Sequence, residues 1–211
     1  MGPVTDNNEE EDTLPAPGLG ADMRAPPWLT SLRPTLCFGP RPKTPDDMHY
    51  LVKRMGLRCF VNASTVPERE AYVGDYGSVF SVRVVDGRMS DRQRKSAPAL
   101  LAHVRALNDH IGGSDRPCYV HAETGLADEA YIALVLWRLI APSEAPADIE
   151  QWMKDNHKQA LFDDDAEKRE LLLECWRLLD AERERLDKMS FFGLPIKRYR
   201  PAKKVKTAGD Q

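Results

Sequence analysis

The sequence lacks a hydrophobic run long enough to cross a membrane. The longest apolar stretch in its 211 residues, around Tyr131 to Ile140, is shorter than the roughly 20 residues that a membrane-spanning helix needs. The first residues are acidic and contain no apolar segment like that of a secretory signal. We therefore expect no membrane contact and an intracellular location, in the cytoplasm or the nucleus.

Cysteine is scarce as well. The four cysteines, Cys37, Cys59, Cys118 and Cys175, have neither a C-x-x-C spacing nor the combined cysteine and histidine spacing of a metal site. Three of them lie in apolar runs. This pattern predicts buried free thiols in a reducing compartment, and it predicts neither a metal nor any other cofactor.

A strong overall charge is also absent, but the two ends of the chain carry opposite charges. The net charge is −3 at pH 7, which argues against a dedicated nucleic-acid binder. Residues 1–25 contain six acidic residues and one basic residue, whereas residues 188–211 contain seven basic residues and one acidic residue. We predict a disordered acidic tail over residues 1–27, one domain over residues 28–188 and a basic tail over residues 189–211.

The basic tail contains a run from Lys197 to Lys206 with six basic residues in ten positions. Such a run is typical of a nuclear localisation signal or a nucleic-acid contact, and a solvated, flexible end has the same composition. Pairing with the acidic N-terminal tail is a third interpretation. The sequence does not distinguish among them, so nucleic acid is a candidate partner only through this segment.

Between the tails, predicted strands alternate with predicted helices. Apolar, β-prone segments predict strands at residues 35–39, 57–63, 78–85 and 118–120. Helical spacing of apolar residues predicts helices at residues 44–56, 98–111, 130–140, about 146–157 and about 165–188. Residues 86–97 are polar and predict a loop. This alternation implies an α/β fold, with a central, mostly parallel sheet flanked by helices.

The segment from Cys118 to Ile140 combines a strand, a tight loop and a long buried helix. Cys118 to Val120 is β-prone, Gly125 interrupts the run, and Ala130 to Ile140 is almost continuously apolar. A strand that enters a helix through a glycine-containing loop directs backbone N–H groups and the positive end of the helix dipole at one point. Such an arrangement favours an anion.

The residues of this loop resemble the signature loop of the protein tyrosine and dual-specificity phosphatases, H-C-x-x-G-x-x-R followed by Ser or Thr. His121 and Gly125 match the pattern. Ala122 occupies the position of the nucleophilic cysteine, Asp128 that of the phosphate-binding arginine, and Glu129 that of the Ser or Thr. The degenerate loop comprises His121, Ala122, Glu123, Thr124, Gly125, Leu126, Ala127 and Asp128.

The resemblance extends to the order of elements over residues 28 to about 185, and it implies the compact fold of a dual-specificity phosphatase. The segment VRVVDGRMSD resembles the strand and loop that carry the general acid in that family. It places Asp86 at the position of this acid, with Asp91 as a second candidate because loop lengths vary. An aspartate before glycine is equally a common turn residue.

The replaced residues are those that carry the chemistry of the family. A low-pKa thiolate attacks phosphorus in these enzymes, whereas the methyl group of Ala122 cannot attack. A carboxylate at the arginine position repels phosphate instead of forming two hydrogen bonds. At about 4 Å and an effective dielectric constant near 20, each such repulsion costs roughly 4 kcal/mol. Cys118 lies upstream in the strand, where we expect it to be buried and inert. Weak or absent phosphate binding is therefore expected.

The acidic residues of the loop have two interpretations. Asp128 or Glu123 can accept hydrogen bonds from the free N–H groups of the loop, as capping residues do. Alternatively, they form an acidic pocket for a Lys or Arg side chain of a partner.

The resemblance thus implies an inactive phosphatase homologue, or pseudophosphatase, that serves as a protein-binding, scaffolding or structural module for an unidentified protein partner. One alternative is an enzyme with altered chemistry that uses Asp86, His121 and the acidic loop. Another is a weak reader of phosphorylated proteins. The sequence leaves homodimerisation open.

Overall fold

The computed structural model describes residues 25–27, 29–64, 81–112, 116–123, 128–156 and 166–191, with side chains up to residue 188. The predicted tails over residues 1–27 and 189–211 lie almost entirely outside these described residues, as do Thr124 to Ala127 of the signature loop. Within the described ranges, none of the helices is long and apolar enough to cross a membrane.

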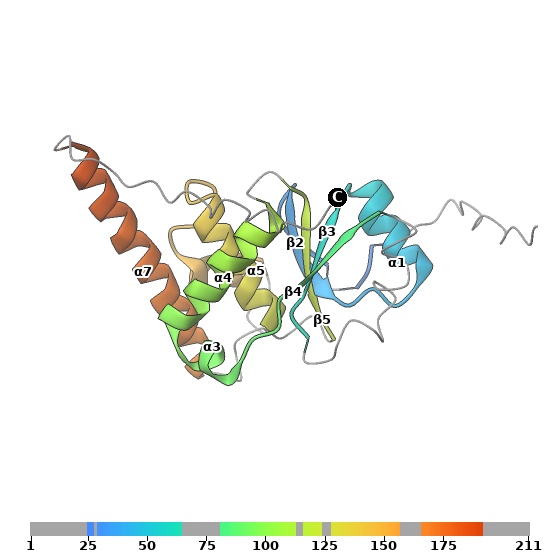
Figure 1. The fold of residues 1–211 in the computed structure, drawn as a ribbon, viewed down its shortest axis with the longest axis horizontal. Helices are drawn as coiled ribbons and strands as arrows, with labels where there is room; N and C mark the ends of the chain where they lie inside the picture. The colour runs from blue at the N-terminus through green and yellow to red at the C-terminus, as the bar shows by residue number, and fades with distance from the viewer. Residues whose placement is uncertain are drawn as a thin grey trace, which may run out of the picture.

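Five strands form one sheet in the spatial order β1-β2-β5-β3-β4 (Figure 1). The strands are β1 (Thr30–Arg33), β2 (Leu36–Pro40), β3 (Cys59–Asn62), β4 (Arg83–Asp86) and β5 (Cys118–Ala122). Only β1 runs antiparallel to its neighbour, and the other three pairings are parallel. The predicted mostly parallel sheet is confirmed, with the β5 strand that leads into the signature loop at its centre.

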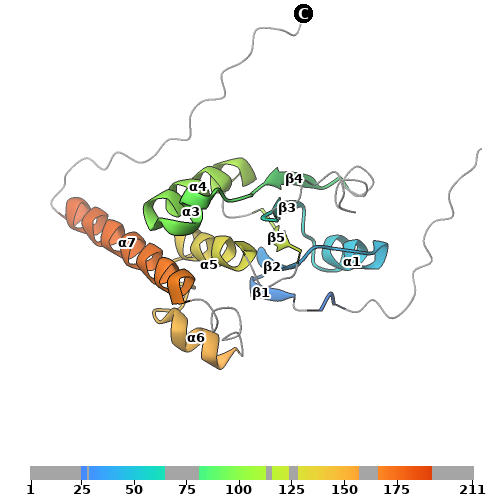
Figure 2. The same ribbon diagram turned by 90° about the horizontal axis from the view of Figure 1, so that it is seen from below.

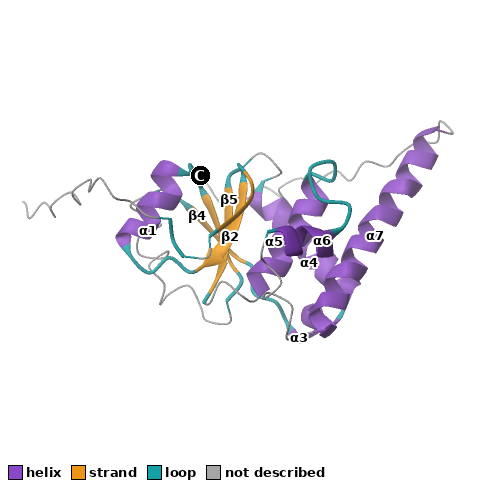
Figure 3. Ribbon diagram, turned by 180° about the vertical axis from the view of Figure 1, so that it is seen from behind, coloured by secondary structure: helices purple, strands orange, loops and turns teal. Residues whose placement is uncertain are grey.

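Helices cover both faces of the sheet, as Figures 2 and 3 show. Helix α1 and its continuation η1 lie on one side, and α4, α5 and α7 lie on the other (Figure 2). The helices are α1 (Pro45–His49), η1 (Tyr50–Arg54, a π-helix), α3 (Asp91–Lys95), α4 (Ala97–Ile111), α5 (Asp128–Ile140), α6 (Ile149–Asp155) and α7 (Ala166–Phe191). This arrangement is the predicted α/β layer fold.

Alternation along the strands divides the core in two, because successive side chains of a strand point to opposite faces. On β5, Cys118 and Val120 join the large cluster beneath α4, α5 and α7, whereas Tyr119 joins the smaller cluster beneath α1 and η1. Both faces of β2, β3 and β5 are buried, so these strands are largely apolar on both sides rather than amphipathic, whereas the edge strand β4 begins and ends with the exposed residues Arg83 and Asp86.

Local signals set the helix boundaries. Thr44 caps α1 in a capping box, in which its hydroxyl accepts from the Asp47 N–H and the Asp47 carboxylate accepts from the Thr44 N–H. Gly112 ends α4 in the left-handed conformation with φ 93°. The helix predicted at residues 44–56 is present, but its second half is π-helical, and Met55 donates its N–H to the Tyr50 carbonyl.

The structure corrects two predictions between residues 78 and 97. Residues 78–80 of the predicted strand at residues 78–85 lie outside the described residues, and from Ser81 onward the strand begins at Arg83, because Ser81 has a positive φ of 54° that interrupts an extended backbone. The predicted loop at residues 86–97 contains the short helix α3, which starts at a capping box between Ser90 and Gln93. This helix contains Arg94, which lies at the candidate site described below.

Candidate functional site at the carboxyl edge of the sheet

The carboxyl ends of four strands meet at one edge of the sheet. Asn62 of β3 is in register with His121 of β5 and with Asp86 of β4, and Pro40 of β2 is in register with Ala122. Ligands of open α/β sheets bind outside this edge. The register therefore brings three of the candidate site residues, Asp86, His121 and Ala122, to the edge where chemistry would occur.

Ala122 occupies the last position of β5 and is 3% exposed. Its carbonyl accepts a hydrogen bond from the Arg41 N–H over 2.6 Å, which continues the ladder from β2. The next residue, Glu123, is exposed. The side chain at the nucleophile position is thus a buried methyl group with no electron pair to donate.

His121 is fully buried and lies flat against an aromatic neighbour. Its ring stacks on Tyr119 with a centroid distance of 5.9 Å and an interplanar angle of 22°. Burial, helped by the positive charge of Arg41, lowers the pKa of His121 to about 3. His121 is therefore neutral at physiological pH, and its ring is a packing element of the strand end.

Asp128, the first residue of α5, forms an ion pair within the molecule. Both Nε and Nη2 of Arg94 lie 2.8 Å from Asp128 Oδ2. Arg94 belongs to α3, and the carboxylate of Asp128 raises the pKa of the Arg94 guanidinium. Arg94 of this chain is thus a partner of Asp128 that neither interpretation from the sequence included, and residues 124–127, whose N–H groups the capping interpretation invoked, lie outside the described residues.

Sequence reasoning missed Arg94 because residues 86–97 were interpreted as a loop. The pattern Ser90-x-x-Gln93 is a capping-box signal, and it would have identified a helix that presents Arg94 on its last turn. Arg94 also approaches Asp91, with Nη1 3.5 Å from Oδ1. Asp91, the second candidate for the general acid, has a side chain that is 94% exposed.

Glu129 follows Asp128 and is completely buried. Burial, and after it the negative charge of Glu129, raises the pKa of Tyr119 well above its ordinary value. Tyr119 donates its hydroxyl hydrogen to the Pro40 carbonyl over 2.6 Å. The carboxylate of Glu129 therefore lies within electrostatic range of the tyrosine on which His121 stacks.

Asp86 lies at the end of β4 and is exposed to solvent. Its carboxylate accepts from Arg88 Nη2 over 2.6 Å, from Arg88 Nε over 2.9 Å and from the Arg88 backbone N–H over 3.1 Å. These hydrogen bonds from Arg88 lower the pKa of Asp86. A general acid needs a proton near neutral pH, so this pairing works against that role.

A further guanidinium, which the sequence analysis did not single out, lies beside the end of β2. Arg41 Nη2 donates to Ser64 Oγ over 2.7 Å, and the Ser64 N–H donates to Asn62 Oδ1 over 2.9 Å. Arg41, Ser64 and Asn62 are therefore linked by internal hydrogen bonds at this edge of the sheet.

The four thiols lie in the core of the domain. All four cysteines are buried and free. Cys118 is in register with Cys59, and a hydrogen bond between the two thiols together with burial raises the pKa of Cys118 well above its ordinary value. Within the described ranges, there is no group of three or more His, Cys, Asp or Glu side chains that could hold a metal ion.

The sheet order, the central strand that enters a buried helix and the helices on both faces define a dual-specificity-phosphatase-like α/β fold. Comparison with solved structures agrees. The core catalytic domain of the PP-IP phosphatase SIW14 from S. cerevisiae matches with a TM-score of 0.54 and 11% identity, over 76% of this chain and 95% of that chain. A mutant form of Tk-PTP matches with a TM-score of 0.52 and 15% identity, over 73% of this chain and 99% of that chain.

PTPMT1 matches with a TM-score of 0.50 and 13% identity, over 75% of this chain and 99% of that chain. No protein-family model and no curated protein matches the sequence. At these identities the likeness extends to the fold, which the chain shares with phosphatases of the protein tyrosine and dual-specificity type.

Proposed function

We propose that this protein is a catalytically inactive member of the dual-specificity phosphatase group, and that it acts as a protein-binding, scaffolding or structural module. The ion pair between Asp128 and Arg94 carries the proposal. An enzyme of this type needs a free guanidinium at the start of the helix to bind two phosphate oxygens. Here that position holds a carboxylate, and an arginine from α3 neutralises it.

Two other features support the loss of catalysis. Ala122 offers no nucleophile at the end of β5. Asp86, held deprotonated by Arg88, is a poor proton donor for a leaving group. The nucleophile and the phosphate-binding arginine are thus replaced, whereas the aspartate at the position of the general acid is retained but paired with Arg88.

The internal ion pair also weighs against the alternative in which Asp128 receives a Lys or Arg side chain of a partner. Arg94 already occupies Asp128 from within, and only 12% of the Asp128 side chain is exposed. A protein partner would therefore bind through another surface. Its identity is a matter for experiment.

The test is a phosphatase assay with an aryl phosphate, paired with calorimetric titration of phosphotyrosine and phosphoserine peptides. We expect the wild-type protein to show neither turnover nor peptide binding. Turnover that persists through purification and disappears in the Asp86→Asn variant would overturn the proposal. Peptide binding without turnover would identify a phosphopeptide reader instead.

A reconstructed variant provides the positive control. Ala122→Cys restores the thiol and Asp128→Arg restores the guanidinium, but the new arginine would place a second positive charge beside Arg94, which now pairs with Asp128. The control therefore includes Arg94→Ala, which removes this like-charge contact. The matched variant with Ala122→Cys and Arg94→Ala, but with Asp128 retained, isolates the contribution of the restored arginine to phosphate binding.

A further inference from the structure

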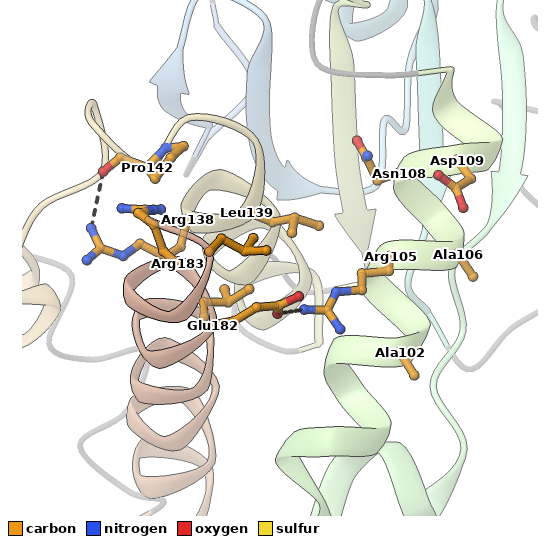
Figure 4. A pocket seen from close by; sticks show the side chains of 12 residues that line it. Ala102, Arg105, Ala106, Asn108, Asp109, Arg138, Leu139, Pro142, Glu182 and Arg183 are labelled. Atoms are coloured by element: carbon orange, nitrogen blue, oxygen red, sulfur yellow. Dashed lines mark hydrogen bonds and ion pairs between the residues drawn. The ribbon is translucent and has the colours of Figure 1, made fainter. Parts of the chain in front are cut away.

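A groove on the far side of the helical layer lies away from the signature loop. It runs between α4 and α7, which diverge toward the C-terminal end of α7 (Figure 1), and it has a volume of about 620 Å³. In Figure 4, Arg105 of α4 meets Glu182 of α7 across the groove, and Leu139 of α5 lies between the two helices. Pockets of roughly 300–1,000 Å³ are typical ligand sites.

The walls of the groove are largely apolar. Leu139, Leu179 and Leu186 contribute aliphatic side chains. Ala102 and Ala106 line the α4 side of the groove with small methyl groups. Leu139 and Leu186 are only half-buried, and both alanines are exposed. An apolar channel on an otherwise charged helical surface is costly to leave open to water.

The chain itself continues with a segment suited to this channel. After Phe191, the last described residue, residues 192–196 read Phe-Gly-Leu-Pro-Ile, an apolar run directly before the basic run. Gly193 and Pro195 cannot extend a helix well and favour a reversal of the chain. The composition thus matches the walls of the groove, and the turn residues stand where a reversal would be needed.

The length of this segment suffices for the return. Leu186 lies five residues before Phe191, which corresponds to about 7.5 Å of helix. Five extended residues span up to about 17 Å. The reversal itself uses about two of these residues, and the remaining three span about 10 Å, so a chain that reverses after α7 reaches back to the level of Leu186.

We propose that residues 192–196 fold back and occupy the groove between α4 and α7. In this proposal, the side chains of Phe192, Leu194 and Ile196 cover the apolar walls of the groove in the same chain. The basic run from Lys197 then leaves the groove beside α4, where Asp109 lines the same channel. The groove is in this way an internal docking site for the C-terminal segment.

Crosslinking tests the proposal in the full-length chain. The four native cysteines are buried, so a pair of introduced surface cysteines reacts selectively with a short bis-maleimide. We expect Ala106→Cys with Leu194→Cys to give a high yield of intramolecular crosslink. The control pair, Ala106→Cys with Ala202→Cys, measures the background from mere tethering, since any tail cysteine has a raised effective concentration. We expect its yield to be several-fold lower.

A deletion series gives the second readout. Removal of residues 192–211 should raise the fluorescence of a hydrophobic dye and lower the melting temperature by a few degrees, whereas removal of residues 201–211 alone should change neither. A synthetic peptide of residues 192–200 should reverse the effect of the longer deletion, and Ala106→Arg should block this rescue. Equal yields for the two cysteine pairs would overturn the proposal. Crosslinks between two molecules would overturn it in favour of a groove that joins two copies.

Discussion

The two carboxylates at the carboxyl edge of the sheet have opposite surroundings. Asp128, at the start of α5, has a side chain that is 12% exposed, and its partner Arg94 comes from another helix, 34 residues earlier. Asp86, at the end of β4, has a side chain that is 60% exposed, and its partner Arg88 is two residues later. Asp128 is thus shielded from water by a contact between two helices, whereas Asp86 forms a local ion pair that remains exposed to water.

The two ion pairs therefore differ in how much each contributes to the stability of the fold. An exposed ion pair contributes little to stability, because water and salt screen it. A pair sheltered from water has been desolvated, and removing one partner leaves the other charge unmatched. The Asp86–Arg88 pair thus disfavours acid catalysis without supporting the fold, whereas the Asp128–Arg94 pair fastens α3 to α5.

The largest effect that sharpens this comparison concerns His121 and pH. The folded state keeps His121 neutral down to about pH 3, whereas the unfolded chain takes up a proton below about 6.5. Stability is therefore lost as pH falls through this window, at about 1.4 kcal/mol per pH unit and up to about 5 kcal/mol in total. Urea unfolding at pH 7 and pH 5 should show a loss of about 2 kcal/mol from this residue.

Other carboxylates contribute to the same pH dependence, so the His121→Gln variant serves as the control. The difference in pH dependence between the wild type and this variant isolates His121. Parallel stability curves from pH 7 to pH 5 would mean that His121 takes up its proton in the folded state. The buried end of β5 would then accommodate a positively charged imidazolium.

The second effect is the loss of the sheltered ion pair. Asp128→Ala leaves Arg94, whose side chain is 27% exposed, with its longer 3.5 Å contact to the exposed Asp91. The variant should lose about 1.5–3 kcal/mol of unfolding free energy, the range for hydrogen bonds to charged groups. Chemical denaturation measures this loss. An unchanged midpoint would show that Asp128 is exposed in solution.

A third effect lies between the two ends, at Gly87. A Cβ at this position would meet Val61 Cγ1 at 2.3 Å and the Asn62 carbonyl oxygen at 3.2 Å. Val61 is β-branched and fully buried, so it has little freedom to move aside. Gly87→Ala should cost about 1–3 kcal/mol. The double variant with Val61→Ala removes the clash, so its loss should be smaller than the sum of the two single losses.

The smallest effect is expected at the exposed end. Asp86→Asn removes the charge of a solvent-exposed side chain and should change the unfolding free energy by no more than about 0.5 kcal/mol. Thermal denaturation at low and high salt checks this. A loss comparable to that of Asp128→Ala would abolish the contrast between the two pairs.

Local signals made much of the fold predictable. The capping box at Thr44, the glycine that ends α4 and the apolar run of α5 all encode their structure within a few residues. The alternation of strands and helices then restricts the topology to a mostly parallel sheet. Strand β1 was not predicted, because it is short and depends on its antiparallel neighbour β2.

The site was less predictable, for a physical reason. Residue types in the signature loop identified what is missing, because a nucleophile and a guanidinium are properties of single residues. What fills their place is a contact between α3 and α5, and no local pattern specifies the partner of Asp128. Arg94 becomes visible only when the register of the strands and the packing of α3 are known.

The most direct test of the account is a double-mutant cycle on Asp128 and Arg94, with unfolding free energies of the wild type, Asp128→Ala, Arg94→Ala and the double variant. We expect a coupling energy of at least about 1 kcal/mol, because Arg94→Ala removes the guanidinium from the sheltered Asp128 carboxylate and Asp128→Ala leaves Arg94 with only the longer contact to Asp91. A coupling energy near zero would show that the two side chains do not pair in solution. The start of α5 would then be open to an external ligand, contrary to the account.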